Sequence, residues 1–287
     1  MKLSEAIRQY HLQMRSDCKS EHTINSYLRD LNNLLDHVGR DTDLNSLTPA
    51  IVNSFIIEWS FTCLRSRTDR QAIERKPNTI NRTKSAVKSF FTWAWELDYI
   101  ERNLAKTVKV KRVGRRIPDY LTQAEQRALL ETIEKAQNRH YYRDQVLFTL
   151  FLETGLRLSE VLNLNIGDIH LSERYLLVRH SKGGVEMKKT LPDNLCGVLQ
   201  EYLTFRGAFT ADTDALFISS QNMRISKGQV SRLLKQYLRE AGIGKSVSVH
   251  SLRHTYAMTV YEATKNIMLV KQALGHRSIM TSAVYLR

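Results

Sequence analysis

The residue types that could do chemistry gather in the last 38 residues, 250–287. His250 and Arg253 are three positions apart, so they lie on one face of a helix that begins near Ser251. A guanidinium and an imidazole on one face can bind one anion together, and a phosphate suits this pair. The spacing therefore predicts a phosphate-binding face.

The end of the chain adds a nucleophile near that face. The apolar helical pattern after Arg253 stops at Gly275, the residue type expected at a helix C-terminus, so His276 lies on a turn. Ser278 can cap a last short helix that brings Tyr285 back toward His276. Together these residues predict a phosphoryl-transfer site with a tyrosine nucleophile.

Plainer explanations exist for each of these residues taken singly. An HxxR pair occurs by chance, and a lone tyrosine is usually half-buried packing. A zinc site is a further alternative because His250 and His254 have i, i+4 spacing. However, Ser251 stands where a zinc protease has its glutamate, and no cluster of cysteines or carboxylates lies nearby, so no metal is expected. The functional interpretation rests on the whole set.

The charge of the chain indicates a polyanionic partner. Its 287 residues include 43 Lys and Arg against 29 Asp and Glu, giving a formal net charge of +14 and a pI near 9.7. The length suggests two domains, and the excess of cations favours nucleic acid. A membrane partner is not expected, because apolar runs such as 146–152 are far shorter than a bilayer span of roughly 18 residues.

Features at the start of the chain and in its cysteines favour the cytoplasm. The first residues mix charged and apolar side chains, which does not fit a signal peptide. Cys18, Cys63 and Cys196 are odd in number and have no CxxC spacing, which is typical of a reducing compartment.

The first hundred residues predict four helices from their apolar periodicity. They are expected over 4–15, after a cap at Thr23, after Thr48 and Pro49, and after Asn78 or Thr79. The apolar stripe of the fourth helix is expected to face inward and comprises Ile80, Val87, Phe90, Phe91 and Trp95. Its cations are left for solvent or phosphate: Arg82, Lys84 and Lys88.

Two basic segments interrupt the helical pattern. Residues 65–76 predict a solvated loop that can contact DNA backbone, and residues 107–118 predict a linker that runs along the phosphates. Expected DNA contacts in the linker are Lys111, Arg112, Arg115 and Arg116. The predicted organisation is a helical DNA-binding domain over 1–106, the linker over 107–118 and a second domain over 119–287.

The second domain opens with a capping box formed by Thr122 and Glu125. A helix over about 141–154 is apolar almost all round, so it should be central and should end at Gly155.

Arg157 follows directly and begins a short helix. An arginine beside so apolar a segment needs an anionic partner, for which Glu160 is the candidate; the alternative is that Arg157 extends to solvent.

Residues 174–191 predict a β-hairpin around Gly183 and Gly184, with Lys182 at the turn. A hairpin tip can reach into a DNA groove, although a lysine at a turn is usually only solvated. The segments expected next are a helix over about 193–206, a short strand over 216–219 and a helix from Ser226 to Gly242.

Five motifs follow the order and spacing of one known family: TGLRLSEVLNL, HSKGG, HSLRHTYA, LGHRS and AVY. The second half of the chain thus resembles the tyrosine recombinase, or phage integrase, family, and the helical first half looks like that family's core-binding domain. The resemblance implies that Tyr285 is the nucleophile and Glu160 a supporting acid. The activating residues that it implies are Arg157, Lys182, His250, Arg253 and His276.

The layout is most similar to Xer-type recombinases and transposon-encoded tyrosine resolvases. The resemblance implies a mainly α fold with a small β-hairpin or sheet in the catalytic domain, and two domains that clamp a DNA duplex. It implies a site-specific recombinase that forms a 3′-phosphotyrosyl intermediate without metal, ATP or any other cofactor. The expected assembly is a homotetramer on double-stranded DNA with paired inverted core sites, with or without a partner recombinase or accessory protein, at the nucleoid.

Chemistry assigns roles within this set. Two guanidiniums and an imidazole can stabilise the charge that develops on a five-coordinate phosphorus. Tyr285 has a reference pKa of about 10, so a base must take its proton, and His250 is the candidate. Lys182 can protonate the leaving 5′ oxygen. A type IB topoisomerase and a catalytically inactive DNA-binding protein are the alternatives; the two-domain layout disfavours the first, and the intact set of six residues disfavours the second.

The resemblance also bears on assembly, because family members usually continue past the tyrosine with a segment that packs on a neighbouring subunit. Only Leu286 and Arg287 follow Tyr285. The expectation is a monomer in free solution that assembles on DNA carrying paired sites.

Overall fold

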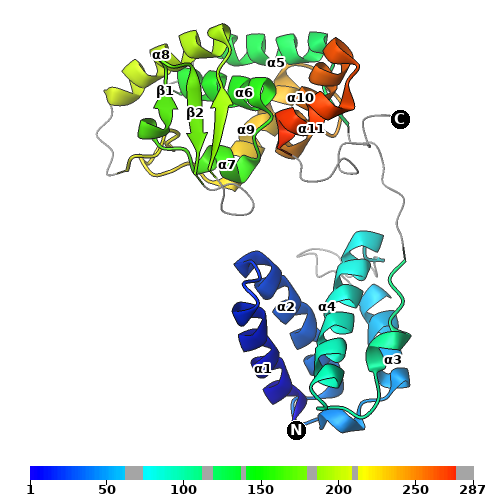
Figure 1. The fold of residues 1–287 in the computed structure, drawn as a ribbon. Helices are drawn as coiled ribbons and strands as arrows, with labels where there is room; N and C mark the ends of the chain where they lie inside the picture. The colour runs from blue at the N-terminus through cyan, green and yellow to red at the C-terminus, as the bar shows by residue number, and fades with distance from the viewer. Residues whose placement is uncertain (62–73, 112–118, 137–139, 180–185, 209–212, 276–287) are drawn as a thin grey trace. The chain divides into compact units, whose positions relative to one another are not determined.

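The computed structural model describes residues 1–61, 74–111, 119–136, 140–179, 186–208 and 213–275. The chain forms two compact units, Met1–Arg115 and Arg116–Arg287, each with a hydrophobic core of its own (Figure 1). Within the described ranges, none of the helices combines the length and the apolar character that a membrane span requires.

The first unit contains the four helices that the periodicity predicts. They are α1 (Leu3–Ser16), α2 (Glu21–Val38), α3 (Pro49–Phe61) and α4 (Pro77–Glu96), with short 3-10 turns at Leu44–Ser46 and Leu104–Thr107. The start of α3 is as predicted, with the Thr48 hydroxyl accepting from the Ile51 amide at 3.3 Å. The cap of α2 is Ser20 instead of Thr23: the Ser20 hydroxyl accepts from the Thr23 amide, so the helix begins earlier than expected.

Aromatic rings from α1 and α4 fill the core of the first unit. Phe90 and Phe91 are fully buried, as predicted, and Trp93 packs among Tyr10, Phe90 and Tyr99. Trp95 was expected to face inward and does not, since 41% of it is exposed. Its position one residue beyond Ala94 lies outside the buried stripe of α4.

Trp59 of α3 makes a hydrogen bond and a cation–π contact within this unit. Its indole donates to the Thr83 hydroxyl at 3.1 Å, and the Arg75 guanidinium lies 3.5 Å from the ring centroid. Arg75 also donates to the Trp59 carbonyl at 2.8 Å, so this cation of the predicted basic loop packs on the protein itself.

The described part of the predicted linker lies against the first unit. Val108 is buried in its core, and the Lys111 carbonyl accepts from Nδ2 of the Asn81 side chain at 2.6 Å. Residues 112–118, which include three of the predicted DNA contacts, lie outside the described residues.

The second unit is a set of helices around α6, with one small sheet (Figure 1). Its helices are α5 (Gln123–Lys135), α6 (Tyr141–Thr154), α7 (Leu158–Leu162), α8 (Asp193–Gly207), α9 (Lys227–Glu240), α10 (Val249–Thr264) and α11 (Ile267–Leu274). The capping boxes of Thr122 with Glu125 and of Ser226 with Gln229 both form, because each needs only residues three positions apart.

The sheet has three antiparallel strands in the order β1 (Ile169–His170), β2 (Tyr175–Val178) and β3 (Met187–Thr190). The predicted hairpin is confirmed, with Tyr175 opposite Thr190 and Val178 opposite Met187. Its turn, including Gly183 and Gly184, lies outside the described residues. The short strand β1 was not predicted.

The predicted strand over 216–219 is wrong. Its backbone bonds go to two different segments: the Leu216 amide donates to Leu164, whereas the Phe217 carbonyl accepts from Ile225 and the Ser219 amide donates to Met223. Only isolated bridges form around this segment, so no ladder builds up. The fold class itself is confirmed as mainly α with a small antiparallel sheet.

Gly155 ends α6 in the left-handed conformation, with φ of 61°. A Cβ at this position would lie 2.2 Å from the ring of Tyr256 on α10. Both the backbone conformation and the close approach of α10 therefore require glycine.

The variant Gly155→Ala is expected to lower the free energy of unfolding by about 2 kcal/mol or more, because left-handed strain and overpacking add. The measurement is urea denaturation of the full chain. Gly167→Ala is the matched control, since nothing lies within 4 Å of a Cβ there. Equal stability of the two variants would contradict this account of Gly155.

Candidate active site

The turn between α6 and α7 positions Arg157. The Arg157 amide donates to Glu160 Oε2 at 2.8 Å, and its Nη1 donates to Glu160 Oε1 at 2.6 Å. Glu160 is buried, whereas 31% of the Arg157 side chain is exposed. The carboxylate thus fixes the guanidinium from the protein side and leaves part of it open to a ligand. The expected partner of Arg157 is the one that the structure provides.

The start of α10 places His250 and Arg253. The helix begins at Val249, two residues before the expected start, because Ser248 caps it and Ser251 completes the capping box. His250 therefore lies in the first turn and Arg253 in the next, as the spacing predicts.

Arg253 connects α10 to the ends of two other helices. Its guanidinium is buried, with Nη1 donating to the Gly155 carbonyl at 2.6 Å and Nη2 donating to the Leu274 carbonyl at 2.5 Å. These acceptors end α6 and α11, so one cation holds three helices together. The predicted end of α11 at Gly275 is confirmed, whereas the break at Lys265 and Asn266, where α10 gives way to α11, was not predicted.

His250 lies in a partly buried and positively charged environment. Partial burial lowers the pKa of His250, and the charges of Arg253 and Arg157 lower it further. His254 packs edge-on against His250, with ring centroids 4.8 Å apart. Burial, followed by His250 and Arg253, lowers the pKa of His254 to about 4. Both imidazoles are therefore neutral at neutral pH.

Lys189 on β3 is a member of this cluster that sequence reasoning missed. Its ammonium donates to the Ala273 carbonyl at the end of α11 and lies 5.2 Å from the centroid of the Tyr256 ring. Burial lowers the pKa of Lys189 to about 8; Arg253 lowers it as well, whereas Glu160 opposes the shift. The available signal was strand alternation, which puts Lys189 on the same face as Met187 and opposite Lys188.

The other predicted site residues divide into two groups. Lys182, His276 and Tyr285 lie outside the described residues, as do Arg112, Arg115 and Arg116. Of the remaining predicted DNA contacts, Lys84 is half-buried, whereas Lys88 and Lys111 are exposed.

Arg82 has an internal partner that the sequence did not indicate. Its Nη2 donates at 2.9 Å to Asp30, which is fully buried. Burial raises the pKa of Asp30, although the charges of Arg82 and Arg29 act in the opposite direction. About a third of the Arg82 side chain is exposed, so Asp30 holds the side chain on the protein side while part of it reaches solvent.

A metal site has no support in the described part of the chain. No group of three His, Cys, Asp or Glu side chains there is arranged to hold an ion. Among the described residues, His250 and His254 have no third side chain of these types placed to complete a zinc site.

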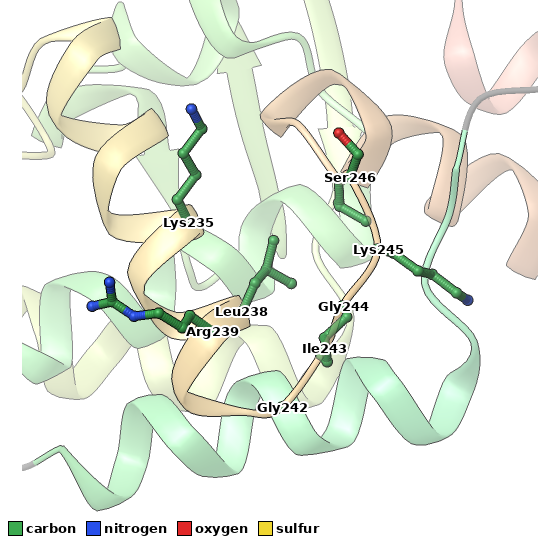
Figure 2. Close-up of a pocket in the computed structure, with 9 residues that line it drawn as sticks. Lys235, Leu238, Arg239, Gly242, Ile243, Gly244, Lys245 and Ser246 are labelled. Carbon is green, nitrogen blue, oxygen red and sulfur yellow. The ribbon is translucent and has the colours of Figure 1, made fainter.

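A surface pocket of about 400 Å³ lies between the end of α9 and the loop that leads to α10 (Figure 2). Lys235 and Arg239 project from α9, and Lys245 lies on the loop. Lys245 donates to Glu125 at 2.7 Å and to the Tyr120 carbonyl, so it joins this loop to the start of α5. The described lining includes none of Arg157, His250 and Arg253, and the pocket is separate from their cluster.

Comparisons with known proteins agree on one family. The model described as "Phage integrase family" matches residues 119–287, and the one described as "Phage integrase, N-terminal SAM-like domain" matches residues 7–96. The tyrosine recombinase XerC of Pelobacter propionicus is 30% identical over 284 residues, which is 99% of this chain and 90% of that protein.

Two solved structures show the same fold. The XerH site-specific recombinase bound to its difH substrate is 20% identical, with a TM-score of 0.71 over 92% of this chain and 76% of that one. The Tn1549 transposon integrase in complex with a circular intermediate DNA is 19% identical, with a TM-score of 0.73 over 99% of this chain and 94% of that one.

Replacing Glu160 tests its structural role. The variant Glu160→Gln is expected to lower the free energy of unfolding by about 1–3 kcal/mol, because a buried ion pair is broken while Arg157 stays partly exposed. Urea denaturation followed by circular dichroism measures it. Glu173→Gln, a change at an exposed position, should stay within about 0.5 kcal/mol of wild type. A Glu160→Gln loss no larger than this control would refute the interpretation.

Proposed function

This chain belongs to the phage integrase family of tyrosine recombinases, and from that premise we propose that it cleaves and rejoins DNA through a 3′-phosphotyrosyl intermediate on Tyr285. As a site-specific tyrosine recombinase, the enzyme acts on DNA. The observation that best supports the proposed chemistry is geometric: Arg253, one helical turn from His250 on α10, donates to the carbonyl of Gly155, two residues before Arg157.

The two arginines are suited to binding the scissile phosphate. Glu160 fixes Arg157, and two carbonyls fix Arg253, so neither guanidinium has to reorganise when charge develops on phosphorus. In this proposal they stabilise the non-bridging oxygens of the five-coordinate transition state, with His276 as a further donor. Preorganised cations of this kind can replace the electrostatic role of a metal ion.

His250 is proposed as the base. Its lowered pKa keeps the imidazole neutral at neutral pH, which is the form that can accept the phenolic proton of Tyr285. The phenolate oxygen then attacks phosphorus, forming the new O–P bond as the bond to the 5′ oxygen breaks. Lys182 is proposed to give its proton to that leaving oxygen.

The proposed reaction needs no ATP or cofactor. One phosphoester replaces another of similar energy, so a 5′ hydroxyl from a second strand can attack the phosphotyrosine and release the enzyme. Repeated on paired inverted core sites by a homotetramer, the step exchanges strands between two duplexes. The chemistry on each strand is the same with or without a partner recombinase or accessory protein in the assembly.

We further propose that both units contact the duplex, with 1–106 as the DNA-binding domain, 107–118 as a linker and 119–287 as the catalytic domain, acting at the nucleoid. The net charge of +14 supports extensive phosphate contact. Arg82 is preorganised by Asp30, which suits a directed contact. The other proposed contacts are Lys84, Lys88, Lys111, Arg112, Arg115 and Arg116.

The variant Tyr285→Phe tests the nucleophile. It is expected to bind DNA with wild-type affinity and to form no covalent adduct, because only the attacking oxygen is removed. Denaturing electrophoresis of the enzyme with labelled target DNA measures the adduct, and a gel-shift titration measures binding. A protein–DNA band that survives detergent in this variant would overturn the proposed function.

Lys182→Ala tests the acid. Cleavage of ordinary DNA is expected to slow by about 10²-fold or more, the typical contribution of a general acid. A substrate with sulfur at the 5′ bridging position should be cleaved at close to the wild-type rate, because a thiolate leaves without protonation. Equal losses on the two substrates would remove Lys182 from this role.

A further inference from the structure

Strand β3 has two different faces. On one face, Met187 and Lys189 are half-buried and approach the end of α11; on the other, Lys188 is exposed and lies 4.4 Å from the centroid of the Tyr175 ring. Met187 Sδ lies 3.5 Å from the position where a side chain on Gly275 would begin. The inner face of β3 thus contacts the last residues of α11.

Two cations bind the last carbonyls of α11. The Lys189 ammonium binds the Ala273 carbonyl, and the Arg253 guanidinium binds the next one, at Leu274. These carbonyls have no partner within the helix, and they form the negative end of its dipole. Lysine and arginine therefore fix the end of α11 from two different elements, β3 and α10.

This end of α11 is the point from which the chain continues to His276 and Tyr285. Strand β3 directly follows the segment 180–185, which contains Lys182. The contact of Lys189 with Ala273 therefore joins the two segments that carry the proposed acid and the proposed nucleophile.

We propose that Lys189 is a positioning residue for DNA cleavage: its ammonium sets the end of α11, and through it the approach of Tyr285 to the phosphate. The inference rests on the proposed function, because it assigns Lys189 a role in that reaction. Lys189 does not transfer the proton or contact the reacting atoms in this role. A loss of its charge misplaces the nucleophile and leaves DNA binding intact.

The environment of Lys189 makes this contact sensitive to pH. The charged groups that face it are Arg253 of α10 and Glu160 of α7, and Tyr256 presents its ring. Because its pKa is lowered to about 8, the ammonium loses its proton just above neutral pH, and the charge-assisted bond to Ala273 weakens. The charge on Lys189 therefore lowers the free energy of unfolding at neutral pH, and removing that charge should not destabilise the fold.

The first experiment compares Lys189→Met with Lys188→Met, which changes the neighbouring lysine on the other face of β3. Single-turnover formation of the covalent adduct should slow by about 10–100-fold in Lys189→Met, the effect of a small misplacement of a reacting group. DNA affinity and the melting temperature should stay near wild type, and Lys188→Met should react normally. An unchanged rate in Lys189→Met, or an equal loss of DNA binding, would overturn the inference.

The second experiment uses Lys189→Arg, which keeps its charge as the pH rises and tests the inference even if Lys189→Met folds poorly. At pH 7, Lys189→Arg should cleave DNA faster than Lys189→Met. Between about pH 7 and 9, the ratio of its cleavage rate to that of wild type should rise, because the wild-type lysine loses its proton. A ratio of the Lys189→Arg rate to the wild-type rate that stays constant with pH would contradict the role of this charge.

The two proposals fail in different ways. A wild-type enzyme that forms no adduct, or an adduct that persists in Tyr285→Phe, would refute the proposed function and with it the inference. A wild-type adduct through Tyr285, together with normal cleavage by Lys189→Met, would refute the role of Lys189 alone.

Discussion

The buried guanidinium of Arg253 is the interaction on which the candidate active site depends. A charge removed from water needs good acceptors, and leaving it unpaired costs several kcal/mol. Two of its acceptors are carbonyls at the ends of α6 and α11, so the charge is satisfied only when both helices end at the right place beside α10. Gly155 makes this approach possible, because any side chain there would collide with Tyr256. The contacts that fold the second unit around Arg253 are thus the same contacts that place its guanidinium for phosphate binding.

The cluster around Arg253 is unbalanced in charge. Arg157, Arg253 and Lys189 bring three cations together, and Glu160 supplies a compensating negative charge. Burial and, after it, neighbouring charges lower the pKa of Lys189 and of both imidazoles, so the cluster resists further protonation. Such an arrangement is costly for the protein alone and favourable when a phosphate contributes negative charge. Stability and anion affinity are therefore opposed at this site.

Sequence alone predicted the features that depend on neighbouring residues. The capping box at Thr122, the end of α6 at Gly155 and the pair of Arg157 with Glu160 all involve contacts within about one helical turn. Predictions failed where distant segments decide. Asp30 and Arg82 are 52 positions apart, and Lys189 and Ala273 are 84 apart, so no local pattern could pair them. The segment 216–219 is β-like in composition, but its partners at Leu164 and Ile225 hold it as an isolated stretch.

The distribution of tryptophan has an optical consequence. Trp59, Trp93 and Trp95 are the three tryptophans of the chain, and all lie in the first unit, one beneath the Arg75 guanidinium, one among aromatic rings and one exposed. Residues 116–287 contain none. Indole fluorescence consequently reports the first unit alone, whereas far-ultraviolet dichroism reports the helices of both. The melting of each unit can be followed in one unlabelled sample, and any difference between the two signals measures how independently the units unfold.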